Sequence, residues 1–293
     1  MIPEGIMCPI ITPCRDTEVD LDATEKLVRH ILKSGVIGVF GAGSTGSFPI
    51  LSEKEEFRFL DFLRGLIDSK HAFFADVSRN NYEDTLELGL KVLDIGPDAI
   101  VLNTPYYIPM RQDAIFAFFD RLLDKLDSDV MLYNIPQLSG NAIKADTLRK
   151  LADEHSNLVG IKESSGNFNN FMAFKDAMPN NFMVYQGQDN LLLPSLSYGA
   201  AGGICGTTNF IDLAVKVYKA NANGKTKQAI LLQKRLTKIK DAISEYPYPL
   251  GTAYLASKVV LGTDSTYVHF PIVDIRKSEK ETLYEAYKEV SSF

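Results

Sequence analysis

The sequence predicts an α/β fold, a (β/α)8 TIM barrel with a small C-terminal helical extension. The chain has 293 residues and is 45% hydrophobic, so it can bury a large core. Eight short apolar runs alternate with amphipathic stretches over roughly 220 residues, close to the ~250 residues typical of such a barrel. A doubly wound open sheet is the structural alternative, but it normally uses fewer strands and does not require this even count.

Each apolar run is predicted to be a buried strand, because short runs rich in β-branched and aromatic residues are typical of buried strands. In chain order the eight runs are GIMCPII (5–11), VIGVF (36–40), AFFADV (72–77), AIVLN (99–103), VMLYNI (130–135), LVGIK (158–162), FMVYQG (182–187) and GGICG (202–206).

Helices are predicted between the strands, where apolar residues recur at helical spacing. The stretch 21–35 carries one apolar face, and Gly35 is placed to end its helix. The stretch 52–67 begins with Ser52 followed by Glu55, which is the pattern of a capping box.

The alternation of strands and helices stops after about Asn223–Gly224. The stretch 225–246 predicts a long helix whose lysines form a solvated face. Its inward residues are expected to be Leu232, Leu236, Ile239 and Ile243. We therefore expect a barrel catalytic domain over residues 1–223 and a C-terminal helical region over residues 224–293.

Composition excludes several classes of partner. The formal net charge is −6, from 31 basic and 37 acidic residues, so no global positive field is available to hold nucleic acid or anionic lipid. No signal peptide and no window of ~18 apolar residues is found. Three widely spaced cysteines, Cys8, Cys14 and Cys205, indicate reduced thiols. We expect a cytoplasmic protein that binds neither nucleic acid nor membrane.

Reactive side chains of such barrels gather at the carboxyl ends of the strands. Lys162 ends the run LVGIK, where burial would lower its pKa and leave a neutral amine that can attack a ketone to form a Schiff base. The alternative is a lysine that extends to solvent from the strand end. Tyr133 lies 29 positions earlier, about one βα repeat, so it should emerge beside Lys162 and could transfer protons there. Taken alone, such a tyrosine is more often a core aromatic residue with its hydroxyl satisfied, so the pair is more informative than either member.

The stretch GSTG, Gly43 to Gly46, offers hydroxyl and backbone N–H groups suited to a carboxylate, although the same residues also simply make turns. The four histidines, His30, His71, His155 and His269, lie outside the strand ends and show no metal-binding spacing. We expect no metal and no organic cofactor.

Four motifs together resemble the class I pyruvate-dependent aldolase family, which includes N-acetylneuraminate lyase, dihydrodipicolinate synthase and 2-keto-3-deoxygluconate aldolase. They occur in the family's order and spacing, and the resemblance covers essentially the whole chain. The motifs are GSTG (43–46), PYY (105–107), YNIP (133–136) and GIKESSG (160–166).

The resemblance implies a role for each residue of these motifs. Lys162 would form a Schiff base with a 2-keto acid such as pyruvate, and Tyr133 would be the acid/base at the aldol carbon–oxygen centre. Ser44 and Thr45 would lie beside the substrate carboxylate, with backbone N–H groups, including that of Gly46, assisting. The substrates would be small 2-keto acids and aldehydes.

Two further sets of residues follow from the resemblance. Tyr107 matches a tyrosine that reaches into the neighbouring subunit's site, which implies a homo-oligomer, commonly a tetramer built as a dimer of dimers. Candidates to bind the rest of the substrate lie in QGQDN and in the last strand end. They are Gly187, Asp189 and Asn190, with Thr207 or Thr208.

Departures from the family's patterns bear on the substrate. Leu138 stands where dihydrodipicolinate synthases carry an arginine, and leucine cannot replace a bidentate carboxylate partner. Asn190 and Gly206 stand where N-acetylneuraminate lyase has an acidic residue and a serine. Both of those activities are therefore disfavoured.

Ser47 and Pro109 instead match the pattern of archaeal-type 2-keto-3-deoxygluconate aldolases. Met110 replaces an arginine that in some of them holds a phosphorylated substrate, and Arg111 comes one position later, so the non-phosphorylated sugar acid is expected to be preferred. The expected reaction is reversible cleavage of 2-keto-3-deoxygluconate, with its galactonate epimer as a second candidate, to pyruvate and glyceraldehyde. The alternatives are N-acetylneuraminate lyase or another pyruvate-releasing lyase, and a keto-acid-binding sensor without turnover.

Overall fold

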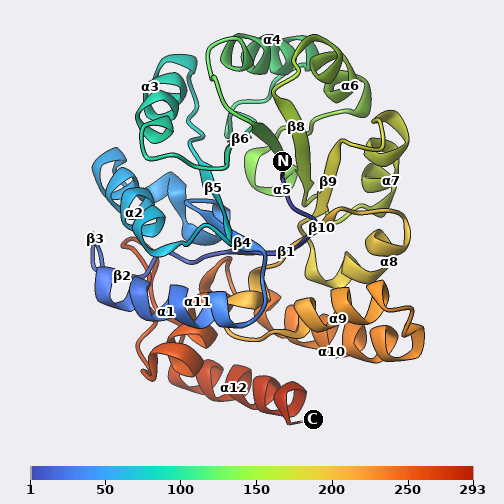
Figure 1. Ribbon diagram of the computed structural model, residues 1–293. Coiled ribbons are helices and arrows are strands. Elements are labelled where there is room, and N and C mark those ends of the chain that lie inside the picture. Colours follow the sequence, from blue (N-terminus) through green and yellow to red (C-terminus); the bar gives the residue numbers. More distant parts are fainter. Residues whose placement is uncertain (1, 293) are drawn as a thin grey trace.

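The computed structural model describes residues 2–292 and confirms the predicted barrel (Figure 1). Eight parallel strands close on themselves, with the first strand paired to both the second and the last. All eight predicted strands are present. They are β1 (Gly5–Pro9), β4 (Gly38–Gly41), β5 (Ala72–Asp76), β6 (Ala99–Asn103), β7 (Val130–Asn134), β8 (Leu158–Glu163), β9 (Met183–Gln186) and β10 (Gly202–Ile204).

A ring of helices surrounds the strands (Figure 1). Its members are α1 (Leu21–Lys33), α2 (Glu53–Leu66), α3 (Tyr82–Leu93), α4 (Gln112–Leu123), α6 (Ala145–Glu154), α7 (Phe168–Ala177), α8 (Leu192–Ser197) and α9 (Leu213–Ala222). As predicted, α1 ends just before Gly35, which has a left-handed φ of +88°. Short helical turns follow several strands at their carboxyl ends, namely η1 (Ser44–Gly46), η2 (Phe48–Ile50), α5 (Pro136–Ser139), η3 (Asp189–Leu191) and η4 (Gly206–Asn209).

A small antiparallel hairpin after β1, made of β2 (Cys14–Arg15) and β3 (Glu18–Val19), was not predicted. Each of its strands has two residues, which is too short for an alternating pattern. The hairpin also changes the predicted capping box. Ser52 accepts a hydrogen bond from the backbone N–H of Glu55 at 3.2 Å, but the Glu55 carboxylate accepts from Val19 N at 2.9 Å instead of turning back to its own helix.

Alternate residues of each strand face the barrel interior, and the residues between them face the helices. On β5, Phe73 and Ala75 belong to the cluster between strands and helices, whereas Ala72 and Phe74 belong to the interior cluster. The same rule turns Tyr133 inward. Lys162 follows Ile161, which packs on the helix side, so the lysine also lies on the interior side at the carboxyl end.

The C-terminal region is largely helical, as expected. It contains α10 (Thr226–Ser244), α11 (Leu250–Ala256), the π-helical turn η5 (Ser257–Leu261) and α12 (Lys277–Ser291). On α10, Leu236, Ile239 and Ile243 are buried, and Leu232 is partly buried against the core. The predicted boundary at residue 223 falls in the turn between α9 and α10. It stays a prediction as a domain boundary, and its outer limits, Met1 and Phe293, lie outside the described residues.

The structure can be compared with two further predictions, those about the cysteines and about the membrane. Cys8, Cys14 and Cys205 are all free and buried. None of the helices within residues 2–292 is long and apolar enough to cross a membrane. The cytoplasmic location stays a prediction.

Candidate active site

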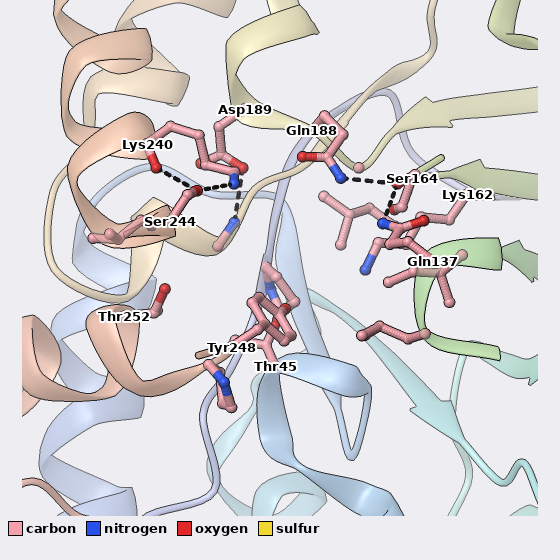
Figure 2. Close-up of a pocket in the computed structure, with 18 of the residues that line it drawn as sticks. Thr45, Gln137, Lys162, Ser164, Gln188, Asp189, Lys240, Ser244, Tyr248 and Thr252 are labelled. Atoms are coloured by element: carbon pink, nitrogen blue, oxygen red, sulfur yellow. Dashed lines mark hydrogen bonds between the residues drawn. The ribbon is translucent and has the colours of Figure 1, made fainter. Parts of the chain in front are cut away.

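A pocket opens at the carboxyl ends of the strands, between the barrel and the C-terminal helices (Figure 2). It encloses about 840 Å³ of space not filled by atoms, including the part open to solvent. Five of the predicted site residues line it, namely Thr45, Tyr133, Lys162, Gly187 and Asp189.

Lys162 lies at the inner wall of this pocket and is only 2% exposed, so its side chain does not extend to bulk solvent. Its Nζ lies 4.1 Å from the ring centroid of Tyr133 and 4.7 Å from that of Phe40. Burial lowers the pKa of Lys162 to about 7, and the carboxylate of Asp76 opposes part of that fall. A large fraction of the amine is therefore neutral at pH 7, which is the form that attacks carbonyl carbon.

Tyr133 is paired in register with Lys162 across β7 and β8, which places the phenol beside the amine. The side chain is 1% exposed, and burial raises the pKa of its phenol far above the ordinary value. Nearby hydroxyls of Ser44 and Ser164 offset part of that rise. The phenol is consequently protonated at neutral pH and can act as a hydrogen-bond or proton donor.

The GSTG stretch forms η1 directly after β4, and only its Thr45 lines the pocket. The Thr45 hydroxyl is hydrogen-bonded to the Tyr248 hydroxyl at 2.5 Å. Ser44 is buried behind the pocket wall and lines a neighbouring cavity. A Cβ atom at Gly46 would come 2.8 Å from the Thr12 hydroxyl, so this glycine serves close packing instead of lining the pocket.

Asp189 lines the pocket but is occupied by hydrogen bonds from the last strand end. Its carboxylate accepts from the backbone N–H groups of Gly206 and Thr207 at 3.1 and 3.0 Å, and from the Thr207 hydroxyl at 2.5 Å. Thr207 is thus turned towards Asp189 and away from the pocket, and Thr208 donates to Cys205 O. Asn190 is not a lining residue either. The sequence had indicated that Asn190 and Thr207 bind substrate, but the structure places neither of them among the residues that line the pocket.

Gly187 leaves room for the hydroxyl of Ser164. A Cβ atom at this position would lie 1.8 Å from the Ser164 hydroxyl, which faces the pocket beside Tyr133. The buried Ser164 hydroxyl acts on the Tyr133 phenol and makes no other hydrogen bond among residues 2–292. It therefore has capacity left for a substrate oxygen.

Tyr107 lies outside the pocket of its own chain. It is 89% exposed, has a left-handed φ of +78°, and donates its backbone N–H to Ser139 O at 3.2 Å. Arg111 is also exposed and pairs with Asp113 at 2.9 Å. Neither residue contributes to the pocket within one chain.

The sequence did not indicate the polar rim that the C-terminal helices add to the pocket. Lys240 departs from the predicted solvated face of α10, because it is half-buried and donates to the Ser244 hydroxyl at 2.7 Å. Figure 2 shows these two residues across the pocket from Lys162. Other unpredicted polar lining residues are Gln137, Gln188, Tyr246, Tyr248 and Thr252. The one available signal was that Lys240 and Ser244 sit one helical turn apart beside the buried Ile243.

One group of possible metal ligands occurs elsewhere. Ligand atoms of Asp120, Glu154 and His155 all lie within 4.8 Å of one another, at the end of α6 that precedes β8 and so at the opposite end of the barrel. His155 Nε2 is already 2.9 Å from Asp120 Oδ1. These residues do not line the pocket, and the expectation of a metal-free reaction stays a prediction.

A buried lysine and tyrosine on adjacent strand ends of a closed (β/α)8 barrel define a candidate lyase site. The signature of the Dihydrodipicolinate synthetase family matches residues 2–290. The chain therefore belongs to this family, and the prediction of a lyase is confirmed at that level.

Similar proteins carry more than one name. The 2-dehydro-3-deoxy-D-gluconate/2-dehydro-3-deoxy-phosphogluconate aldolase of Picrophilus torridus is 36% identical over 79% of this chain and 86% of its own length. The 4-hydroxy-tetrahydrodipicolinate synthase of Methanopyrus kandleri is 30% identical over 98% of this chain and 96% of its own.

Solved structures agree with this assignment. The 2-keto 3-deoxygluconate aldolase from Picrophilus torridus superposes with a TM-score of 0.88 at 34% identity, covering 94% of this chain and 99% of that one. A prophage protein of the dihydrodipicolinic acid synthase family from E. coli K12, in complex with pyruvate, superposes with a TM-score of 0.92 at 26% identity over 98% of both chains.

The pKa of Lys162 leads to a prediction about its reactivity. Because only the neutral amine reacts, the rate of acetylation of Lys162 by acetic anhydride should rise with pH through a midpoint of about 7 and level off above it. Peptide mass spectrometry after short exposures between pH 5 and pH 10 measures this midpoint. A midpoint near the ordinary lysine value would show that Lys162 is solvated in solution.

Proposed function

We propose that the protein is a Schiff-base aldolase that reversibly cleaves 2-keto-3-deoxygluconate to pyruvate and glyceraldehyde. The observation that carries this proposal is a buried lysine of lowered pKa beside a protonated tyrosine, at the wall of a pocket with a polar rim. The names of the Picrophilus torridus relatives support the substrate class.

In the proposed reaction the Lys162 amine attacks the C2 carbonyl of the sugar acid. A C–N bond forms, the carbonyl oxygen leaves as water, and a protonated imine remains. The electron pair of the C3–C4 bond then moves into a C2–C3 double bond while the imine nitrogen becomes neutral. Breaking C3–C4 leaves an enamine of pyruvate and releases C4 as the aldehyde. Water hydrolyses the enamine, after protonation at C3, to pyruvate and the free amine.

Tyr133 has a role that follows from its protonated state. In the synthetic direction the enamine carbon attacks the aldehyde, and the Tyr133 O–H donates its proton to the forming C4 alkoxide. In cleavage the Tyr133 phenol first gives its proton to the carbinolamine hydroxyl, which leaves as water, and the resulting phenolate then takes the proton of the C4 hydroxyl as the C3–C4 bond breaks. The hydroxyls of Ser44 and Ser164 next to Tyr133 stabilise the phenolate between these two moments.

Leu138 supports an aldolase over a dihydrodipicolinate synthase. It lines the pocket, and among the lining residues of the described chain none is an arginine. A second carboxylate on the substrate would therefore lack a bidentate partner. The polar rim opposite Lys162 suits the hydroxyl groups of a sugar acid better.

A substrate panel tests the proposed activity. Pyruvate release, followed with lactate dehydrogenase, should be fastest with 2-keto-3-deoxygluconate or its 6-phosphate, and slower with the galactonate epimer, N-acetylneuraminate and 4-hydroxy-2-oxoglutarate. Lys162→Ala should abolish release because no Schiff base can form. Fastest turnover of N-acetylneuraminate would retain the mechanism but refute the substrate. Pyruvate binding without release from any substrate would favour the sensor.

Lys240 extends the proposal to the phosphorylated substrate. Its ammonium and the Ser244 hydroxyl stand across the pocket from Lys162, where the C6 end of a substrate held at C2 would lie. A phosphate is a strong acceptor of charge-assisted hydrogen bonds. The sequence-based preference for the non-phosphorylated acid did not take this rim into account. The rim supports acceptance of both the phosphorylated and the non-phosphorylated sugar acid.

The Lys240 proposal is tested by comparing two substitutions on one helix. Lys240→Met should lower kcat/KM for 2-keto-3-deoxygluconate 6-phosphate by about tenfold or more, the scale of one charged hydrogen bond, and affect the non-phosphorylated acid much less. Lys238→Met is the matched control, because Lys238 faces outward and pairs with Glu289. Equal losses for both substrates would argue against phosphate recognition by Lys240.

We also propose that the chain forms a homo-oligomer, a tetramer in its complete form, with Tyr107 entering the neighbouring subunit's site. Tyr107 and Ile108 are 89% and 65% exposed on the loop after β6, an unusual exposure for adjacent apolar residues. Light scattering should give a native mass well above the 32.6 kDa of one chain. Ile108→Glu should lower that mass, whereas Leu90→Glu on α3 should not. A monomeric native protein would refute the proposal.

A further inference from the structure

One buried carboxylate in the barrel interior takes no part in the reaction described so far. Asp76 is the last residue of β5 and has no exposed surface. Because Phe74 faces the interior and Ala75 faces the helices, Asp76 faces the interior again. It therefore lies at the same end of the barrel as Lys162, three strands away.

The hydrogen bonds of Asp76 fix one of its carboxylate oxygens and leave the other without a donor. Oδ1 accepts from the backbone N–H of Ser78 at 2.9 Å and from the Ser78 hydroxyl. That hydroxyl in turn accepts from the backbone N–H of Asn103 at 2.6 Å, which ties the group to the next strand. Among residues 2–292, the buried Oδ2 has no hydrogen-bond partner. Such an oxygen is costly unless a nearby positive charge compensates it.

Lys162 is the cation left to compensate Asp76. Arg79 is the other basic group that acts on Asp76, but its guanidinium is paired with Glu56 at 2.6 Å. Of all charged groups, Asp76 has the largest electrostatic effect on Lys162. Burial raises the pKa of Asp76 to about 6, with Ser78 and Lys162 opposing the rise, so the carboxylate is mostly ionised at neutral pH.

The other groups that face Lys162 cannot take this role. Burial raises the pKa of Cys8 to about 12 and raises that of Cys205 well above its ordinary value, so both thiols are uncharged. Tyr133 is a protonated phenol. Asp189 is engaged by the donors of Gly206 and Thr207. Asp76 remains as the ionised group with a free oxygen.

We propose that Asp76 is the counter-charge of the protonated Schiff base on Lys162, a positioning residue that stabilises the positive nitrogen from inside the barrel. This inference rests on the proposed function. The imine must be protonated to draw the electron pair out of the C3–C4 bond, and burial disfavours that charge. A fixed carboxylate at the same strand ends offsets the cost.

The separation of the two groups matters as much as their charges. No ion pair within 4.0 Å and no hydrogen bond joins Asp76 to Lys162 in the described chain. A direct ion pair would hold the lysine as an ammonium ion and block its attack. At a longer distance, the carboxylate lowers the energy of the cation without occupying the nitrogen lone pair.

The first test measures the coupling without any keto acid. Acetylation of Lys162 by acetic anhydride against pH should show a midpoint about one pH unit lower in Asp76→Asn than in the wild type, because the ammonium loses its counter-charge. Asp76→Ala, which removes the same charge with a different shape, should shift it in the same direction. Near-ultraviolet circular dichroism checks the fold of both variants.

Glu163→Gln is the matched control. Glu163 is a buried carboxylate next to Lys162 in sequence, but it faces the outside of the barrel, where Asn134 and Ser165 hydrogen-bond it. Its replacement should leave the Lys162 midpoint unchanged. An unshifted midpoint in a folded Asp76 variant, or an equal shift in Glu163→Gln, would overturn the role of Asp76.

The second test addresses the Schiff base itself. Borohydride trapping with pyruvate, read by intact mass, should label wild-type Lys162 over a broad pH range. As the pH is raised, the trapped fraction of Asp76→Asn should begin to fall at a lower pH than that of the wild type, because its imine loses the proton more readily. The kcat of this variant should be about tenfold lower or more. No adduct in the wild type would refute the proposed function and this role with it. A normal adduct with the same pH profile in both proteins would refute the role of Asp76 alone.

Discussion

The desolvation of one lysine is the constraint on which the rest of the site depends. An ammonium surrounded by the rings of Phe40 and Tyr133 loses the water that would stabilise its charge, so the neutral amine becomes accessible near pH 7. An open sheet would leave this strand end in contact with solvent. The closed barrel shields the amine from water except at the pocket, and this burial yields a neutral nucleophile near pH 7.

Parallel pairing provides the second requirement, which is a proton donor at a fixed position. Tyr133 and Lys162 are partners in register on β7 and β8, so the rigid backbone sets their separation. The same burial that lowers the pKa of the lysine raises that of the phenol. One environment thus produces a neutral base and a neutral acid side by side, which is the combination that imine formation and aldol chemistry require.

Local signals in the sequence predicted the strands and the Lys162–Tyr133 pair, because strand spacing and residue type are properties of single segments. The polar rim could not be predicted in this way. Lys240 lies four residues after the buried Leu236 and three before the buried Ile243, so its spacing places it near the inward side of α10, but only the packing of that helix against the barrel creates a pocket there. Thr207 is a related case, since the direction of its hydroxyl depends on Asp189 from another strand end, and its part in substrate binding stays a prediction. Asp76 was part of a correctly predicted strand, but its lack of a partner is visible only in three dimensions.

The two ends of the pocket come from different parts of the chain, and this separates chemistry from recognition. Bond formation at Lys162 depends on the barrel interior, where a change of charge or volume alters pKa values and packing at once. The opposite rim is built from α10 and the segment around Tyr248, and its side chains Lys240, Ser244 and Tyr248 are half-buried or exposed and so less constrained by packing. Under the proposed mechanism, a change of substrate therefore costs least at Lys240 and Ser244. Tyr248 is the exception within that rim, because its bond to Thr45 connects recognition directly to the loop beside the reacting carbon.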